Sequence, residues 1–198
     1  MGKLKTIYFA LLNNKEKIVR KNEIVDLIEK YDKEIKKVNV KNALWYLSRY
    51  GYIKRIFLDF YYINSIEERE RGICDYEDKE LLFSVLNRSS TRWYLGLSSA
   101  KYYSGDIWQV PNVLTIINNK FSGKKNIIGM KIHFIKIKDG LIFGLVSKKT
   151  ENHIKYFYSD KQKTELDFGY LKLLDKIPKD KITNKYIKRY PKWLQKLT

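Results

Sequence analysis

The sequence predicts an α+β protein built in two parts. Apolar residues recur at helical spacing through about the first 50 residues, and two short runs rich in aromatic and β-branched residues follow. Beyond residue 90, several β-prone runs alternate with short helical patterns. Residues 66–80 carry a net charge of −4, whereas residues 1–65, 81–170 and 171–198 carry +7, +8 and +7. An acidic segment therefore separates a basic N-terminal part from a basic remainder.

The composition narrows the function classes. A net charge of +18 and a pI near 9.7 favour a polyanionic partner, with nucleic acid ahead of an anionic membrane surface. Cys74 is the only cysteine and the chain has two histidines, so neither an internal disulfide nor a Cys/His zinc site is expected. The N-terminus lacks a signal-peptide core, and no apolar run reaches about 18 residues. We expect a cytoplasmic protein without a membrane partner.

Two helices are expected at about residues 3–13 and from Asn22 onward. Their apolar residues share a helical spacing: Leu4, Ile7, Leu11 and Leu12, then Ile24, Leu27, Ile28 and Tyr31. Residues 32–37 form the turn into a third helix. The buried face of that helix is predicted from the spacing of Val40, Ala43, Leu44 and Leu47. We expect Asn39 to cap its first turn and Gly51 to close it in the left-handed conformation.

Strand-like runs at residues 52–56 and 60–63 follow the third helix and form a hairpin. Three helices and a hairpin predict a winged helix-turn-helix at residues 1–65, with the third helix as the recognition helix. Its candidate DNA-binding residues are Lys36, Lys37, Asn39, Lys41, Asn42, Tyr46 and Arg49, with Lys54 and Arg55 from the wing. Asn42 suits an adenine edge and Arg49 a guanine or a phosphate, while the lysines suit phosphates.

Two alternatives remain open for this part. Trp45 and Tyr46 either face DNA, where they would contact sugars or thymine methyl groups, or pack against the wing or the next domain; for Trp45 we expect packing. The alternative for the whole part is a generic three-helix bundle with a hairpin that binds protein. The polar residues off the apolar face of the third helix, and Lys36 and Lys37 at its entrance, count against this alternative.

Residues 66–90 are expected to form a charged connector and a bridging helix at about 76–87. A mixed α/β domain follows at residues 91–175. We expect a strand at 91–97, a helix capped by Ser98 and ended by Gly105, and strands at 112–117, 127–138, 141–147 and 153–158. Asp139-Gly140 predicts a two-residue hairpin turn. Ser159 and Gln162 predict a capping box that opens a helix to about residue 174.

Several motifs of this domain resemble one known family. They are Trp93-Tyr94-Leu95, Ser98-Ser99-Ala100-Lys101, Gly105, Pro111, residues 113–117 and Asp160-Lys-Gln-Lys-Thr-Glu-Leu-Asp167. Together they resemble the AbiEi antitoxins and their regulator relatives, from type IV toxin–antitoxin (abortive infection) systems. Lys101 stands where an apolar residue is usual, and Gln162 replaces an acidic one. The resemblance implies an autorepressor that binds inverted repeats in its own promoter and counters a nucleotidyltransferase-like toxin, or a stand-alone regulator.

No phosphate-binding loop, paired-histidine metal motif or nucleophile elbow is present, so we expect no catalytic residue, metal or cofactor. Asp160 is expected near the positive end of a helix dipole, and Asp167 on a helix surface or at an interdomain contact. A restriction-type nuclease is the enzymatic alternative, but it needs an acidic pair on a strand. Asp139 and Glu151 fall in a turn and a loop instead.

The basic tail at residues 176–198 has two compatible interpretations. Lys185, Lys188, Arg189 and Lys192 are candidate phosphate contacts, while Ile187, Trp193 and Leu194 are candidates for docking on the domain before it. The sequence therefore predicts a DNA-binding regulator acting on double-stranded DNA as a homodimer or as cooperating monomers. The alternative from another class is a module that sequesters a protein partner.

Overall fold

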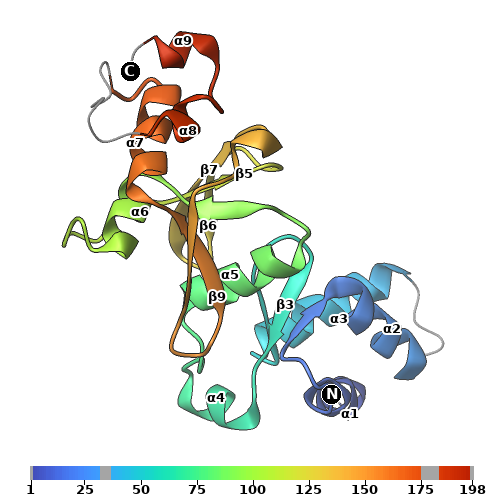
Figure 1. Cartoon of the computed structure of the whole chain (residues 1–198). Coiled ribbons are helices and arrows are strands. Elements are labelled where there is room, and N and C mark those ends of the chain that lie inside the picture. Colours follow the sequence, from blue (N-terminus) through green and yellow to red (C-terminus); the bar gives the residue numbers. More distant parts are fainter. Residues whose placement is uncertain (1, 32–36, 175–182, 197–198) are drawn as a thin grey trace. The chain divides into compact units, whose positions relative to one another are not determined.

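The computed structural model describes residues 2–31, 37–174 and 183–196 (Figure 1). The protein is of mixed α+β class, as predicted. The chain divides into two compact units, Met1–Val85 and Leu86–Thr198, with the division inside helix α5 (Asp78–Arg88). Residues 66–85, which the sequence led us to expect as a connector and bridging helix, therefore belong to the first unit.

The first unit begins with helices that enclose a small antiparallel sheet. Its elements are α1 (Gly2–Leu12), β1 (Ile18–Arg20), α2 (Lys21–Tyr31), α3 (Lys37–Arg49), β2 (Ile53–Arg55) and β3 (Phe60–Ile63). The strand order is β1-β3-β2, so β3 pairs with both other strands. Ile7, Leu11, Ile24, Ile28 and Leu47 belong to one buried cluster. The sequence did not predict β1, because three residues are too few to display an alternating pattern.

Helix α3 buries the predicted stripe. Val40, Ala43, Leu44 and Leu47 are all buried. Gly51 has φ +68° and Tyr52 N–H donates to the Leu47 carbonyl at 2.9 Å, so the predicted left-handed ending is confirmed. The predicted cap is wrong, because α3 begins at Lys37 and Asn39 lies inside its first turn.

The first unit continues with α4 (Ile66–Arg71), a helix that the sequence interpretation missed. Ser65 and Glu68 form a capping box, and Gly72 ends the helix with φ +67°. The Ser-x-x-Glu pattern and the glycine were visible in the sequence, but the high charge of the segment favoured a connector.

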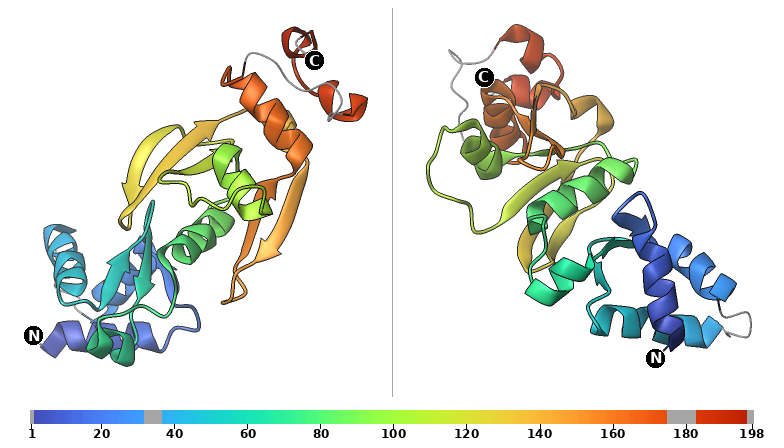
Figure 2. Two further views of the ribbon diagram at one scale, coloured as in Figure 1. Left: turned by 90° about the vertical axis from the view of Figure 1, so that its left-hand side faces the viewer. Right: turned by 90° about the horizontal axis from the view of Figure 1, so that it is seen from below.

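The second unit is a six-stranded mixed sheet with helices. Its elements are β4 (Trp93–Leu95), α6 (Leu97–Ser104), β5 (Leu114–Asn118), β6 (Gly123–Ile127), β7 (Met130–Lys136), the 3-10 helix η1 (Asp139–Leu141), β8 (Leu145–Lys149), β9 (Lys155–Ser159) and α7 (Lys161–Tyr170). The strand order is β6-β7-β5-β4-β9-β8. The β4–β9 and β5–β7 pairs are parallel and the others antiparallel. The left view of Figure 2 shows β6 and β7 (yellow) at one side of this sheet and β9 (orange) at the other.

The predicted hairpin at Asp139-Gly140 is wrong. The hairpin joins β6 to β7 through Ile128 and Gly129, which have φ +49° and +81°. Positive φ at both central positions is the geometry of a type I′ turn, whose twist matches the paired strands. Asp139 instead starts η1, and its carboxylate accepts a hydrogen bond from the Asn119 amide at 3.1 Å. Strand β8 pairs with β9 rather than with β7.

Both predicted serine caps are also wrong. Gly96 is the N-cap of α6, and a Cβ there would lie 2.3 Å from the Ile117 side chain. Ser99 Oγ accepts a hydrogen bond from the Thr115 backbone N–H. Asp160 is the N-cap of α7 and accepts from the Lys163 N–H at 2.8 Å. In each case the strand before the helix ends one or two residues away from its expected end, so the helix is capped by a different residue.

A buried ion pair joins α7 to β4 and to the tail. Lys163 is fully buried and Asp167 nearly so, and the Lys163 ammonium donates to the Asp167 carboxylate and to the Tyr94 and Tyr190 hydroxyls. Both tyrosines also donate to Asp167 at 2.7 Å. Burial lowers the pKa of Lys163, against the opposing effect of Asp167. Asp167 is thus a core residue, which corrects the expected surface position.

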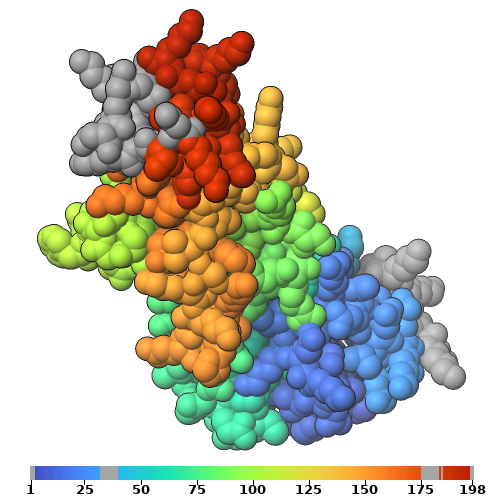
Figure 3. Space-filling view, in the orientation of Figure 1, coloured from blue at the N-terminus to red at the C-terminus, as the bar shows by residue number. Residues whose placement is uncertain are grey.

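The tail carries two short helices, α8 (Asn184–Ile187) and α9 (Lys192–Gln195). Tyr190 and Leu194 are buried, and Trp193 stacks on Tyr170 with ring centroids 6.0 Å apart. The tail (red) lies directly on the segment coloured orange, which includes α7 (Figure 3). The docking interpretation of the tail therefore agrees with the structure.

Replacing Lys163 with Met should lower the free energy of unfolding by about 3–5 kcal/mol, because the Asp167 charge stays buried without its partner. The Lys163→Met/Asp167→Leu double variant should lose less than this single variant, since no unpaired charge remains. Urea unfolding followed by circular dichroism measures both. Lys161→Met, at an exposed position on the same helix, is the control and should change stability by less than about 0.5 kcal/mol. A double variant less stable than Lys163→Met would contradict this account.

Candidate nucleic-acid interface

From Lys41 onward, one face of α3 is open to solvent. Lys41, Asn42 and Arg49 are exposed, and none of them has a hydrogen bond or ion pair within the described part of the chain. Trp45 is 58% exposed and Tyr46 is 43% exposed, so the expectation that Trp45 packs within its own unit is wrong. Burial of the apolar stripe on the other side of α3 leaves this polar face outward.

An aromatic row runs along the same face. Trp45 meets Tyr46 edge-on with ring centroids 4.9 Å apart, and Tyr46 stacks on Tyr50 at 6.2 Å. Tyr50 is 41% exposed and was not among the candidate residues. Its i+4 spacing from Tyr46 was the available signal. These rings offer flat apolar surfaces with polar tips, which suit sugars, thymine methyl groups or a protein partner.

The remaining candidates at the start of α3 are only partly described. Lys36 lies outside the described residues. For Lys37 and Asn39 the structure describes the helical backbone but not the side chains. These three residues therefore remain sequence predictions.

The β2–β3 hairpin, which the sequence led us to expect as a wing, has fewer unpaired cations than its sequence suggests. Lys54 forms an ion pair with Asp78 at 2.7 Å. The Arg55 guanidinium donates to the Leu58 carbonyl at 3.4 Å, within the turn that joins β2 to β3. Arg55 remains exposed and can reach a phosphate, but Lys54 would have to leave its carboxylate.

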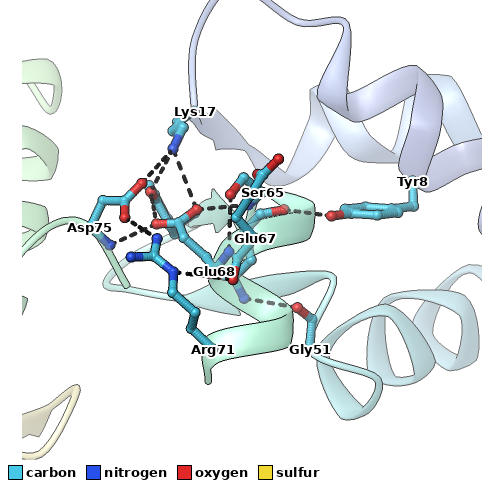
Figure 4. A network of polar contacts seen from close by, with 10 residues as sticks. Tyr8, Lys17, Gly51, Ser65, Glu67, Glu68, Arg71 and Asp75 are labelled. Atoms are coloured by element: carbon cyan, nitrogen blue, oxygen red, sulfur yellow. Dashed lines mark hydrogen bonds and ion pairs between the residues drawn. The ribbon is translucent and has the colours of Figure 1, made fainter. Parts of the chain in front are cut away.

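The buried Glu68 carboxylate of α4 joins β3, the start of α4, the segment after α4 and Lys17 (Figure 4). Glu68 accepts hydrogen bonds from the Tyr62 hydroxyl at 2.6 Å and from the Ser65 and Asp75 backbone N–H groups at 2.7 and 2.8 Å. Lys17 lies 3.4 Å from it. Burial alone would raise the pKa of Glu68, but these hydrogen bonds and the Lys17 charge outweigh it and lower the pKa to about 2.

The same region holds the end of α3 in place. The Asn64 amide donates to the Gly51 carbonyl at 2.8 Å, and the Tyr8 hydroxyl donates to the Asn64 carbonyl at the same distance. The Arg69 guanidinium lies 4.1 Å from the centroid of the Tyr52 ring. The C-terminal end of α3 is thereby tied to α1, β3 and α4, which gives its exposed side chains a rigid support.

Among the described residues, each unit has a cavity that is open to solvent. The first, of about 290 Å³, lies beside the end of α3 and includes Arg69 and Cys74. The second, of about 340 Å³, includes Arg92, Trp93 and Phe157. Burial raises the pKa of the Cys74 thiol, which keeps it protonated at neutral pH. Within the described ranges, no group of three or more His, Cys, Asp or Glu residues could hold a metal ion.

The cations of the tail lie on its outer side. Lys185, Lys188, Arg189 and Lys192 are exposed while Tyr190 and Leu194 are buried. The Arg189 guanidinium rests 4.6 Å from the Phe143 ring centroid, so it is partly engaged within the unit. Phosphate contact by these residues remains a prediction that is sterically open.

The chain was compared with known proteins. No protein-family model matches it, and a search of curated proteins finds no relative at a significant level of similarity. Among the described residues, no helix is both long and apolar enough to span a membrane. The resemblance to the AbiEi antitoxins therefore depends on the motif residues named above.

Lowering the pH should destabilise the first unit through Glu68. Its folded pKa of about 2 lies below the ordinary value of 4.5, so the ionised carboxylate stabilises the fold above pH 4.5 and this contribution is lost as the pH falls toward 2. The contribution is about 3 kcal/mol. Glu68→Gln should lose much of this stabilisation at pH 7, and its free energy of unfolding should depend less on pH below 4.5, as measured by urea unfolding at several pH values. Glu70→Gln, at an exposed position on the same helix, should leave this pH dependence unchanged.

Proposed function

We propose that the protein is a sequence-specific DNA-binding transcriptional regulator, and that residues 1–65 form a winged helix-turn-helix. The order of elements supports this assignment: three helices are interleaved with a three-stranded sheet of order β1-β3-β2, and the β2–β3 hairpin follows α3 directly. In such domains the helix before the hairpin lies in the major groove. The observation that carries the proposal is the solvent-facing side of α3, where Lys41, Asn42 and Arg49 have no partner in the described residues.

The chemistry of this face suits base recognition. The Asn42 amide can donate to and accept from an adenine edge, and the Arg49 guanidinium can donate twice to a guanine. Lys41 and Arg55 can neutralise phosphates that fix the helix in the groove. Tyr46 and Trp45 would cover thymine methyl groups or sugars beside them. A helix of this kind fits a major groove about 12 Å wide.

We further propose an autorepressor of the AbiEi antitoxin type, which would bind inverted repeats as a homodimer or as cooperating monomers. The support is the motif from Asp160 to Asp167. Asp160 caps α7, and Lys163 and Asp167 form the buried ion pair of the second unit, so three motif positions have definite structural roles. A nucleotidyltransferase-like toxin would be the cognate partner. The localisation that follows from this role is cytoplasmic.

A protein-interaction module is the second candidate. The observation in its favour is the row of Trp45, Tyr46 and Tyr50, since exposed aromatic residues are enriched in protein interfaces. The nuclease alternative gains no support: none of the strands β4 to β9, as described, contains an Asp or Glu residue.

The proposal predicts specific loss of DNA affinity from two single changes. A binding duplex is first selected from a randomised double-stranded library with the full chain. Asn42→Ala and Arg49→Ala should each weaken its binding by about 1–3 kcal/mol, roughly 5- to 150-fold, and relax selectivity at one base pair. Fluorescence anisotropy at fixed salt measures the affinity. Lys15→Ala removes an exposed charge in the turn after α1 and is the control; it should change affinity equally little for every duplex.

Unchanged binding in both α3 variants would reject α3 as the recognition helix. If selection enriches no sequence, and Trp45→Ala instead abolishes capture of a protein partner, the interaction module would replace the regulator.

A further inference from the structure

The β6–β7 hairpin lies in the longest basic stretch of the second unit. Residues 107–138 contain no Asp or Glu and six lysines. Five of these, Lys124, Lys125, Lys131, Lys136 and Lys138, are exposed and have no hydrogen bond, ion pair or ring contact within the described residues. Lys120 differs, because it donates to the Ser89 carbonyl at 3.2 Å. This hairpin therefore presents a concentration of unneutralised charge.

The strand register distributes these charges over both sides of the hairpin. Lys124 lies opposite His133 and Asn126 opposite Lys131, so these four side chains share one face. Lys125 lies opposite Ile132 and points to the other face. No two lysines of β6 and β7 are directly opposite, and the diagonal from Lys124 to Lys131 spans about 7–8 Å. This spacing limits repulsion between them and leaves each ammonium group free to reach a separate anion.

The opposite edge of the same sheet provides a contrast. On β8, Lys148 donates to the Tyr103 carbonyl at 3.4 Å and lies 5.3 Å from the Tyr158 ring centroid. On β9, Lys155 lies 5.1 Å from the Phe157 ring centroid. These lysines are used within the unit, whereas those of β6 and β7 are not. Protection of an edge strand against pairing with another chain explains lysines on β6, but not Lys131 on the inner strand β7.

Strand β6 is the edge of the six-stranded sheet, whereas β7 is paired with β5 on its other side. The β6 edge and the turn from β6 to β7 can therefore lie along the phosphate backbone of a duplex. Flexible lysine side chains act as point charges on phosphates and carry little sequence information. The absence of acidic residues from 107 to 138 removes the repulsion that would oppose such contact.

We propose that the β6–β7 hairpin is a second DNA-contacting surface, which binds the sugar-phosphate backbone of a duplex through Lys124, Lys125 and Lys131. The proposal rests on the function inferred above in taking duplex DNA as the polyanion. It adds a surface in the second unit that supplies affinity without sequence selectivity, whereas α3 supplies selectivity.

The test measures the salt dependence of binding with the full chain. The affinities of the selected duplex and of a scrambled duplex are determined at several NaCl concentrations for a Lys124→Gln/Lys125→Gln/Lys131→Gln variant. The slope of log K against log salt should become shallower by about 2–3, because about 0.9 counterions are released per phosphate contact. Both duplexes should lose affinity by the same factor, about tenfold or more at 0.1 M salt.

Two matched variants separate this effect from a general loss of charge or of fold. Lys148→Gln/Lys149→Gln/Lys155→Gln removes the same charge from the other edge of the sheet and should change the slope by less than about 1. Lys124→Arg/Lys125→Arg/Lys131→Arg keeps the charge and should keep the slope. Circular dichroism verifies that each variant is folded.

Equal slope changes in the two glutamine variants, or an unchanged slope in the β6–β7 variant, would overturn the proposal. If the β6–β7 glutamine variant self-associates instead, these lysines serve only to protect the sheet edge. The proposed role of α3 is tested independently. It is rejected if Asn42→Ala and Arg49→Ala leave selectivity intact, whether or not the β6–β7 glutamine variant changes the salt dependence. If the full chain binds no duplex at any salt concentration, both proposals are rejected.

Discussion

The burial of one stripe of α3 is the constraint on which the proposed interface depends. Val40, Ala43, Leu44 and Leu47 enter the core of the first unit, and each buried leucine contributes about 1.5–3 kcal/mol. Rotating the helix to hide Trp45 would expose those leucines. Trp45, Asn42 and Arg49 are therefore held outward by the core rather than by contacts of their own. Gly51 then ends the helix, and β2 begins two residues later at Ile53, so the hairpin follows the helix closely.

Among the described residues, each unit contains a buried ionic group that is hydrogen-bonded by tyrosine. Glu68 is satisfied by Tyr62 and two backbone N–H groups, and the Lys163–Asp167 pair by Tyr94 and Tyr190. Replacing a whole buried ion pair with apolar residues often changes stability little, whereas losing one partner is strongly destabilising. They therefore act mainly to specify a single arrangement: Glu68 positions α4 behind the end of α3, and the ion pair positions the tail on α7.

Several acidic residues form ion pairs within their own unit, which leaves the positive charge unevenly distributed. Asp75 and Asp78 pair with Lys17 and Lys54 inside the first unit. No acidic residue lies between residues 107 and 138, and Lys124, Lys125 and Lys131 of the β6–β7 hairpin form no ion pair within the described residues. The net charge of +18 is thus unevenly available to a polyanion, and α3 and the β6–β7 hairpin both present exposed cations without a partner among the described residues.

The sequence alone determined the features that depend on local spacing: the helix stripes, the left-handed Gly51, the β-prone runs and the candidate residues Lys41, Asn42 and Arg49. The tertiary structure decided what depends on register and burial. The strands on either side of Asp139-Gly140 do not form a hairpin, because β8 pairs with β9 rather than with β7. Asp167 moved from an expected surface into the core because Lys163 and two tyrosines, 69 and 27 residues from Lys163 along the chain, converge on it. Such convergence has no local signal in sequence, since each residue alone is ordinary.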